Sequence, residues 1–146
     1  MEELLVDILK QRVLQAMSLT GDFYNHINDG CLTLRISDVL SNTIGEQAYC
    51  MIGARESYLK SLKMGHWAGF DCSLTDSNDN TLINSKMKET HANIERFLLD
   101  NSLDQMNSNL LFDLLEHEVQ HHGQLIRYAY ANKIDFPKSW NIRYTV

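Results

Sequence analysis

The sequence predicts an all-α protein, a single up-down four-helix bundle. Only one of its 146 residues is a proline, Pro137, so long stretches lack the residue that most effectively breaks helices. Apolar residues recur at spacings of three and four in four separate segments, whereas the one short run with strand character is 31–36. Four long amphipathic segments are typical of a bundle.

The first two helices are expected in the N-terminal half of the chain. Apolar residues keep a helical phase over residues 2–27, which predicts one long helix. A second helix is expected to start near Ser37 or Ser41. Thr43 and Glu46, three residues apart, match a capping box and mark the same helix start.

The other two helices and a terminal segment follow a long loop. A stretch rich in Gly, Asn, Asp and Ser begins at Gly65 and ends the second helix. Helical spacing then predicts a third helix over 82–99 and a fourth over 110–131. Trp140 and Tyr144 are expected to pack back on the bundle or to join a dimer interface, since an unanchored tail seldom carries such large apolar groups.

Composition narrows the classes of function. The length predicts one domain spanning 1–146, and the 44% of hydrophobic residues suffices for a core of its own. A net charge of -6 without any basic run argues against nucleic acid as a partner. The absence of a signal-peptide pattern and of any apolar run of bilayer length predicts a cytoplasmic protein that does not enter the membrane. The cysteines show no CxxC spacing and are expected to be reduced thiols; they are Cys31, Cys50 and Cys72.

Three of the six histidines lie within six positions of the fourth expected helix. His117 and His121 are four residues apart, so both imidazoles lie on one helix face and can direct their nitrogens at one divalent ion. Such a pair supplies only two ligands, and zinc needs more. Glu118 and His122 form a second pair at the same spacing, and periodicity alone leaves both pairs open.

The stretch 117–121 also matches HExxH, the zinc motif of metallopeptidases. A metzincin would need glycine at 124 and histidine at 127, where this chain has Gln124 and Arg127. No glutamate follows Glu118 to serve as a downstream ligand. The sequence therefore argues against a peptidase.

The stretch from His117 through His121 to Gln124, with glycine before the glutamine, resembles the signature of the DinB-like (DinB/YfiT) family. The downstream residues 136–140, Phe-Pro-Lys-Ser-Trp, and the Gly-Ala-Arg-Glu-Ser-Tyr-Leu stretch at 53–59 add to the resemblance, which covers essentially the whole chain. It implies a four-helix bundle, often a homodimer, that holds zinc or nickel between its second and fourth helices. Some members are thiol-dependent transferases or isomerases.

The resemblance implies that His117 and His121 are metal ligands. It also implies a third histidine from the second helix, but 41–62 contains none. Gln47 has the phase best suited to replace it. Cys50 and Thr43 are the alternatives, and a thiolate is a better zinc ligand than a carboxamide.

Two functions follow as expectations. The first is a divalent-metal-dependent thiol transferase or hydrolase with an incomplete histidine triad, acting on a small molecule or a thiol. Glu118 is a candidate acid or base, but a role on the helix surface or in support of the metal ligands is favoured for it. The second is a metal-free small-molecule-binding or interaction protein, in which the inward histidines form a hydrogen-bond network inside a dimer.

Overall fold

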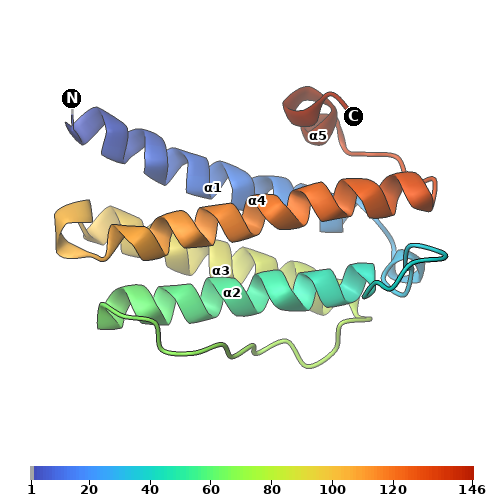
Figure 1. The fold of residues 1–146 in the computed structure, drawn as a ribbon, viewed down its shortest axis with the longest axis horizontal. Helices are drawn as coiled ribbons and strands as arrows, with labels where there is room; N and C mark the ends of the chain where they lie inside the picture. Colours follow the sequence, from blue (N-terminus) through green and yellow to red (C-terminus); the bar gives the residue numbers. More distant parts are fainter. Residues whose placement is uncertain (1) are drawn as a thin grey trace.

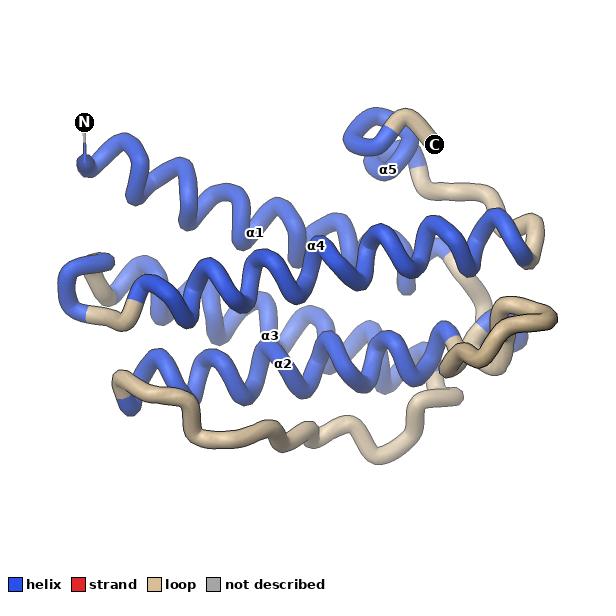
Figure 2. The backbone as a smooth tube through the Cα atoms, viewed as in Figure 1, coloured by secondary structure: helices blue, strands red, loops and turns tan. Residues whose placement is uncertain are grey.

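The computed structural model describes residues 2–146, and the prediction of an all-α protein is confirmed over this range, which is helical or irregular throughout (Figure 2). Two short 3-10 helices, Asp29–Cys31 and Leu103–Gln105, lie in the connections between longer elements. The α-helices are α1 (Glu2–His26), α2 (Ile44–Met64), α3 (Asn80–Asp100), α4 (Ser108–Ala131) and α5 (Lys138–Tyr144).

The four long helices lie side by side (Figure 1). Both α1 and α2 pack against α3 and α4, so each long helix has two neighbours. Figure 1 shows that α1 and α4 run in one direction and that α2 and α3 run in the other. Consistent with this, the Asn80 side chain at the start of α3 donates to the Ile27 carbonyl just beyond the end of α1, at 2.9 Å. Helix direction therefore reverses at every long connection except the one between α2 and α3.

The start of α2 depends on its cap. Thr43 has an extended backbone, and its hydroxyl accepts the amide N–H of Glu46 at 3.1 Å, so the predicted capping residue is confirmed. The predicted starts near Ser37 and Ser41 are wrong, because the chain before Thr43 is irregular. At the other end Gly65 adopts a left-handed backbone with φ of 84°, a conformation that favours glycine and ends the helix.

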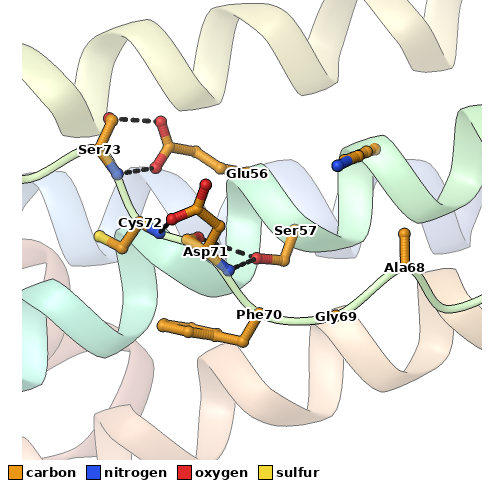
Figure 3. Close-up of a pocket in the computed structure, with 9 residues that line it drawn as sticks. Glu56, Ser57, Ala68, Gly69, Phe70, Asp71, Cys72 and Ser73 are labelled. Carbon is orange, nitrogen blue, oxygen red and sulfur yellow. Dashed lines mark hydrogen bonds between the residues drawn. The ribbon is translucent and has the colours of Figure 1, made fainter.

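Residues 65–79, here called the 65–79 segment, run back along α2 and allow α3 to start at the same end of the molecule (Figure 1). Figure 3 shows how this segment is attached to α2. The Ser57 hydroxyl bonds both the N–H and the carbonyl of Asp71 at 2.9 Å, and the Glu56 carboxylate accepts from the N–H and hydroxyl of Ser73. The Phe70 ring lies where a Cβ on Gly53 would be, so only glycine lets the segment approach this closely. A cavity of about 250 Å³ remains between the segment and the helix.

The interior consists of two apolar clusters with a polar layer between them. One cluster surrounds Phe23, Ile44 and Trp140, and the other surrounds Val13 and Leu111. The polar layer is fully or almost fully buried and comes from all four long helices; its members are Thr20, Arg55, Thr90, Glu118 and His122. Buried polar groups need hydrogen-bond partners, and the residues of this layer bond to one another.

The C-terminal segment packs on the bundle, as the sequence predicts for Trp140. Its indole is fully buried against Phe23, and its N–H donates to the Leu19 carbonyl at 2.6 Å. Tyr144, at the end of α5, is half-buried. Within residues 2–146, no helix is both long enough and apolar enough to cross a membrane.

Candidate metal centre

The three neighbouring histidines of α4 separate into two groups. A helix turns about 100° per residue, so His117 and His121 lie on one face while His122 points to another. His117 and His121 face one another, and His121 contacts Gln47 of α2. His122 bonds Thr20 of α1. Of the two pairs that the sequence leaves open, His117 and His121 approach one another directly, whereas Glu118 and His122 meet through the Thr20 hydroxyl.

These two imidazoles approach through the same ring atom. Their Nε2 atoms are 3.3 Å apart and their ring centroids 4.5 Å apart. His121 is buried, whereas His117 lies at the edge of the bundle and is partly exposed. His117 is therefore the more accessible ring of the pair.

Gln47 holds His121 from the other ring nitrogen. The His121 Nδ1–H donates to Gln47 Oε1, and the Gln47 amide N–H in turn donates to Asn42 Oδ1 at 2.8 Å. The Tyr128 hydroxyl of α4 also donates to Asn42, so this series of hydrogen bonds ends on the bundle. Because Nδ1 carries the proton, His121 Nε2 has its lone pair directed at His117.

Burial lowers the pKa of both imidazoles. The pKa of His121 falls to about 4, chiefly because the ring is removed from water and secondly because His117 is close. Burial also lowers the pKa of His117. Both rings are therefore neutral at pH 7, the form in which histidine binds metals.

The pair fits two positions around one ion. Two nitrogens bound at about 2.1 Å to a tetrahedral zinc ion are about 3.4 Å apart, close to the 3.3 Å found between the two Nε2 atoms. A bound histidine usually donates its other ring N–H to a carbonyl or carboxylate oxygen, as His121 does to Gln47. His117 Nδ1 is buried without a partner among the described atoms, so His117 is held less firmly than His121.

A third ligand is missing from the part of the chain that the structure describes, where no three His, Cys, Asp or Glu side chains form a group suited to a metal. Gln47 lies at the site, but its oxygen bonds the Nδ1 of His121 and not the Nε2 side of the pair. The Thr43 hydroxyl caps α2. Cys50 is partly exposed, and burial raises the pKa of its thiol, which disfavours the thiolate that metals bind.

Arg55 is a central residue of the polar layer that the sequence analysis did not identify. Its guanidinium forms a buried ion pair with Glu118, and both side chains are fully buried. All five N–H groups have acceptors: both Glu118 oxygens, the Thr90 hydroxyl, and the carbonyls of Met17 and Met87. In the sequence, this ion pair was indicated only by an arginine on the buried face of α2 and a glutamate on the buried face of α4.

Glu118 is a structural anion. Burial by itself would raise the pKa of its carboxyl, but the charge and hydrogen bonds of Arg55 outweigh this effect and hold the pKa below its usual range. The carboxylate also accepts the Thr20 hydroxyl at 2.7 Å. These contacts leave no oxygen directed at the His117 and His121 pair, so the geometry disfavours an acid or base role for Glu118.

His122 links this ion pair to the C-terminal helix. Since the Thr20 proton goes to Glu118, the Thr20 oxygen accepts from His122 Nε2–H at 2.7 Å. The other nitrogen, Nδ1, then accepts the Tyr144 hydroxyl at 2.6 Å. Burial lowers the pKa of His122 to about 4, so the ring stays neutral inside this chain of hydrogen bonds.

No protein-family model matches this chain, and a search of curated proteins finds no match either. The histidines of α4 and the geometry of the residues around them are then what indicates a function for this chain.

Proposed function

We propose that this chain is a DinB-like four-helix-bundle protein that binds one divalent metal ion, zinc or nickel, through the Nε2 atoms of His117 and His121. The observation that carries the proposal is the 3.3 Å separation of these two atoms, with Gln47 engaging the opposite nitrogen of His121. This separation matches two ligands of one ion. Gln47 is then a positioning residue and not a ligand.

The residues around such a site would have separate roles. Gln47 and Asn42 fix the tautomer and orientation of His121, and the surrounding core keeps that ring neutral. His117, at the exposed edge, is the side from which a small molecule would enter. Arg55 and Glu118 keep α2 and α4 in register, so the two halves of the site stay opposed.

A divalent ion held by two side chains has open positions, and there it would supply Lewis-acid activation of a thiol or water. This favours a thiol transferase or a hydrolase acting on a small molecule. General acid or base catalysis would come from the substrate's own groups or from solvent, because Glu118 is held in the ion pair with Arg55.

Variants at position 47 test the role of Gln47. Calorimetric titration of the untagged protein with Zn²⁺ or Ni²⁺ should give one site per chain, lost in His117→Ala and in His121→Ala. Gln47→Ala should weaken binding about 10- to 100-fold, because His121 loses the group that orients it. Gln47→His should not strengthen binding, because a side chain at this position meets the Nδ1 side of His121 and not the Nε2 atoms of the pair.

An equal affinity in Gln47→Ala and the parent would remove Gln47 from the site. Asn141→Ala is the matched control, since Asn141 is an exposed amide on α5 and should leave the titration unchanged.

A second function, a metal-free small-molecule-binding or interaction protein, is favoured by one observation. The described residues bring no third metal-binding side chain to the histidine pair, and His117 Nε2 can instead donate a hydrogen bond to His121 Nε2. Absence of binding in the same titration, at ion concentrations up to about 1 mM, would support this alternative over the metal site.

A further inference from the structure

Cys72 of the 65–79 segment packs against the backbone of α2 beside a second cysteine. Its thiol donates to the Tyr49 carbonyl oxygen at 3.3 Å, and its Cβ lies 2.9 Å from where a Cβ on Gly53 would be. Cys50 directly follows Tyr49 and comes three residues before Gly53, so it is a neighbour of Gly53 on the helix surface. Two cysteines that are far apart in the sequence are therefore close together in the fold.

Covalent geometry limits the distance between Cys72 and Cys50. A carbonyl oxygen and the Cα of the next residue are about 2.8 Å apart across a trans peptide bond. With the 3.3 Å contact to the Tyr49 oxygen, the Cys72 sulfur is at most about 6 Å from the Cys50 Cα. In a disulfide the corresponding distance is about 4 Å. A rotation about χ1 of Cys50 and a shift of Cys72 by about 2 Å bring the two sulfurs to bonding distance.

The 65–79 segment is suited to this shift. It contains no helix or strand, and the side chains of Ser57 and Glu56 hold it on α2. Backbone outside regular secondary structure is held by fewer hydrogen bonds, so it moves more readily than a helix. Figure 3 shows the Cys72 sulfur pointing away from Ser57 and Glu56, toward the earlier turns of α2, where Cys50 lies.

Both thiols can be reached by a small molecule. Cys50 and Cys72 are free and partly exposed, and Cys72 also lines the cavity of about 250 Å³ between the segment and the helix. Burial raises the pKa of both thiols, which leaves only a small fraction of each as thiolate at pH 7. Exchange with a disulfide should therefore become faster as the pH increases.

We infer that Cys50 and Cys72 form a reversible disulfide that attaches the 65–79 segment covalently to α2. The reaction is exchange with a small-molecule disulfide such as oxidised glutathione. The Cys72 thiolate attacks one sulfur of that molecule and releases the other as a thiolate, and the Cys50 thiolate then attacks the Cys72 sulfur and releases the second. The two protein thiols lose two electrons and two protons, and the small disulfide is reduced to two thiols.

The oxidation state then determines how firmly the segment is attached. In the reduced chain shown here, hydrogen bonds from Ser57 and Glu56 hold it on α2. In the oxidised chain a covalent bond acts beside them and closes a loop of about 20 residues, which restricts the unfolded chain and stabilises the fold.

Mass spectrometry of the full chain after incubation with oxidised glutathione tests the pair. The parent should lose two hydrogen atoms and, when digested without reductant, give two peptides joined through Cys50 and Cys72. Dithiothreitol should reverse the change. Cys31→Ser is the matched control and should behave as the parent, because Cys31 lies on the short 3-10 helix before α2 and is not part of the pair.

Single variants of the pair show whether the bond closes within one chain. Cys50→Ser and Cys72→Ser should each stop at a glutathione adduct on the cysteine that remains. A disulfide through Cys31, disulfides between chains only, or adducts on both Cys50 and Cys72 without closure would overturn the inference.

Thermal melts test whether the disulfide fastens the segment. The oxidised parent should melt about 5–10 °C above the reduced parent. Ser57→Ala should lower the melting temperature of the reduced protein, because Asp71 loses both of its bonds to the hydroxyl. The loss should be smaller in the oxidised protein, where the disulfide still holds the segment. Equal losses in the two forms, or no change in melting temperature on oxidation, would contradict the covalent attachment.

Discussion

Arg55 and Glu118 show how far one buried residue depends on its partner. Every N–H of the guanidinium has an acceptor, and both carboxylate oxygens are used. Removing either charge would leave the other buried without compensation, which is much more costly than losing an exposed ion pair. A single substitution in this pair should therefore lower the stability of the fold substantially.

Glu118→Gln should lower the free energy of unfolding by about 3–5 kcal/mol, since the Arg55 charge then remains buried and unpaired. Urea denaturation followed by circular dichroism measures the change. The exposed pair of Lys86 and Glu89 provides the control, and Glu89→Gln should cost less than about 1 kcal/mol. Equal losses in the two variants would show that the buried pair contributes no more than a surface one.

The depressed pKa values of His121 and His122 predict acid sensitivity. Each ring has a pKa of about 4 in the folded chain, mainly because of burial, whereas an unfolded histidine titrates near 6.5. Between these values the unfolded chain binds more protons, so stability falls as the pH decreases from about 6.5 to 4 and is flat just above that window.

Thermal melts of the chelator-treated protein at a series of pH values measure this effect. His122→Asn should reduce the slope, because one of the two buried rings is gone. A slope unchanged in that variant would mean that His122 does not contribute to the linkage.

Helix ends and helix faces could be predicted from the sequence where neighbouring residues determine them. Thr43 and Gly65 mark the ends of α2 through capping chemistry, and the four-residue spacing of His117 and His121 places both on one face. The contact of Gln47 with His121 Nδ1 was out of reach, because phase indicates the side of a helix on which a residue lies and not which ring nitrogen it meets. The partners of Arg55 come from three other helices, so no local sequence pattern predicts them.

Gly123→Ala tests how much a glycine inside α4 costs the fold. Alanine favours helix, and nothing lies within 4 Å of the new Cβ in one chain, so the melting temperature of dilute protein should rise by about 2–4 °C. Gly45→Ala is the contrasting control, because its Cβ would clash with the Ser77 carbonyl and should destabilise the fold. A loss of stability in Gly123→Ala would show that Gly123 is needed within the single chain.

For the molecule as a whole, the 65–79 segment determines the relative direction of α2 and α3. An up-down order assumes that consecutive helices are antiparallel neighbours joined by short loops. Here the segment returns along α2, so α2 and α3 run in the same direction. Its attachment through Ser57, Glu56 and the close approach at Gly53 joins residues distant in sequence, which helical periodicity does not report.

The packing of the helices also determines which residues face His117 and His121. Since α2 and α4 are neighbours, the residues of α2 opposite the pair would determine whether the proposed metal ion had two ligands or three. Gln47 occupies that place and bonds one ring, and the polar layer of Arg55 and Glu118 holds the two helices together nearby. The proposed metal site thus has two imidazole ligands and open positions.

X-ray absorption spectroscopy of the zinc-loaded, untagged protein tests whether the ion has these two imidazole ligands. Two imidazole nitrogens at about 2.0–2.1 Å, completed by oxygen donors and lost in the His117→Ala, His121→Ala double variant, are the predicted result. A sulfur ligand, three or more imidazoles per ion, or an unchanged spectrum in the double variant would contradict it.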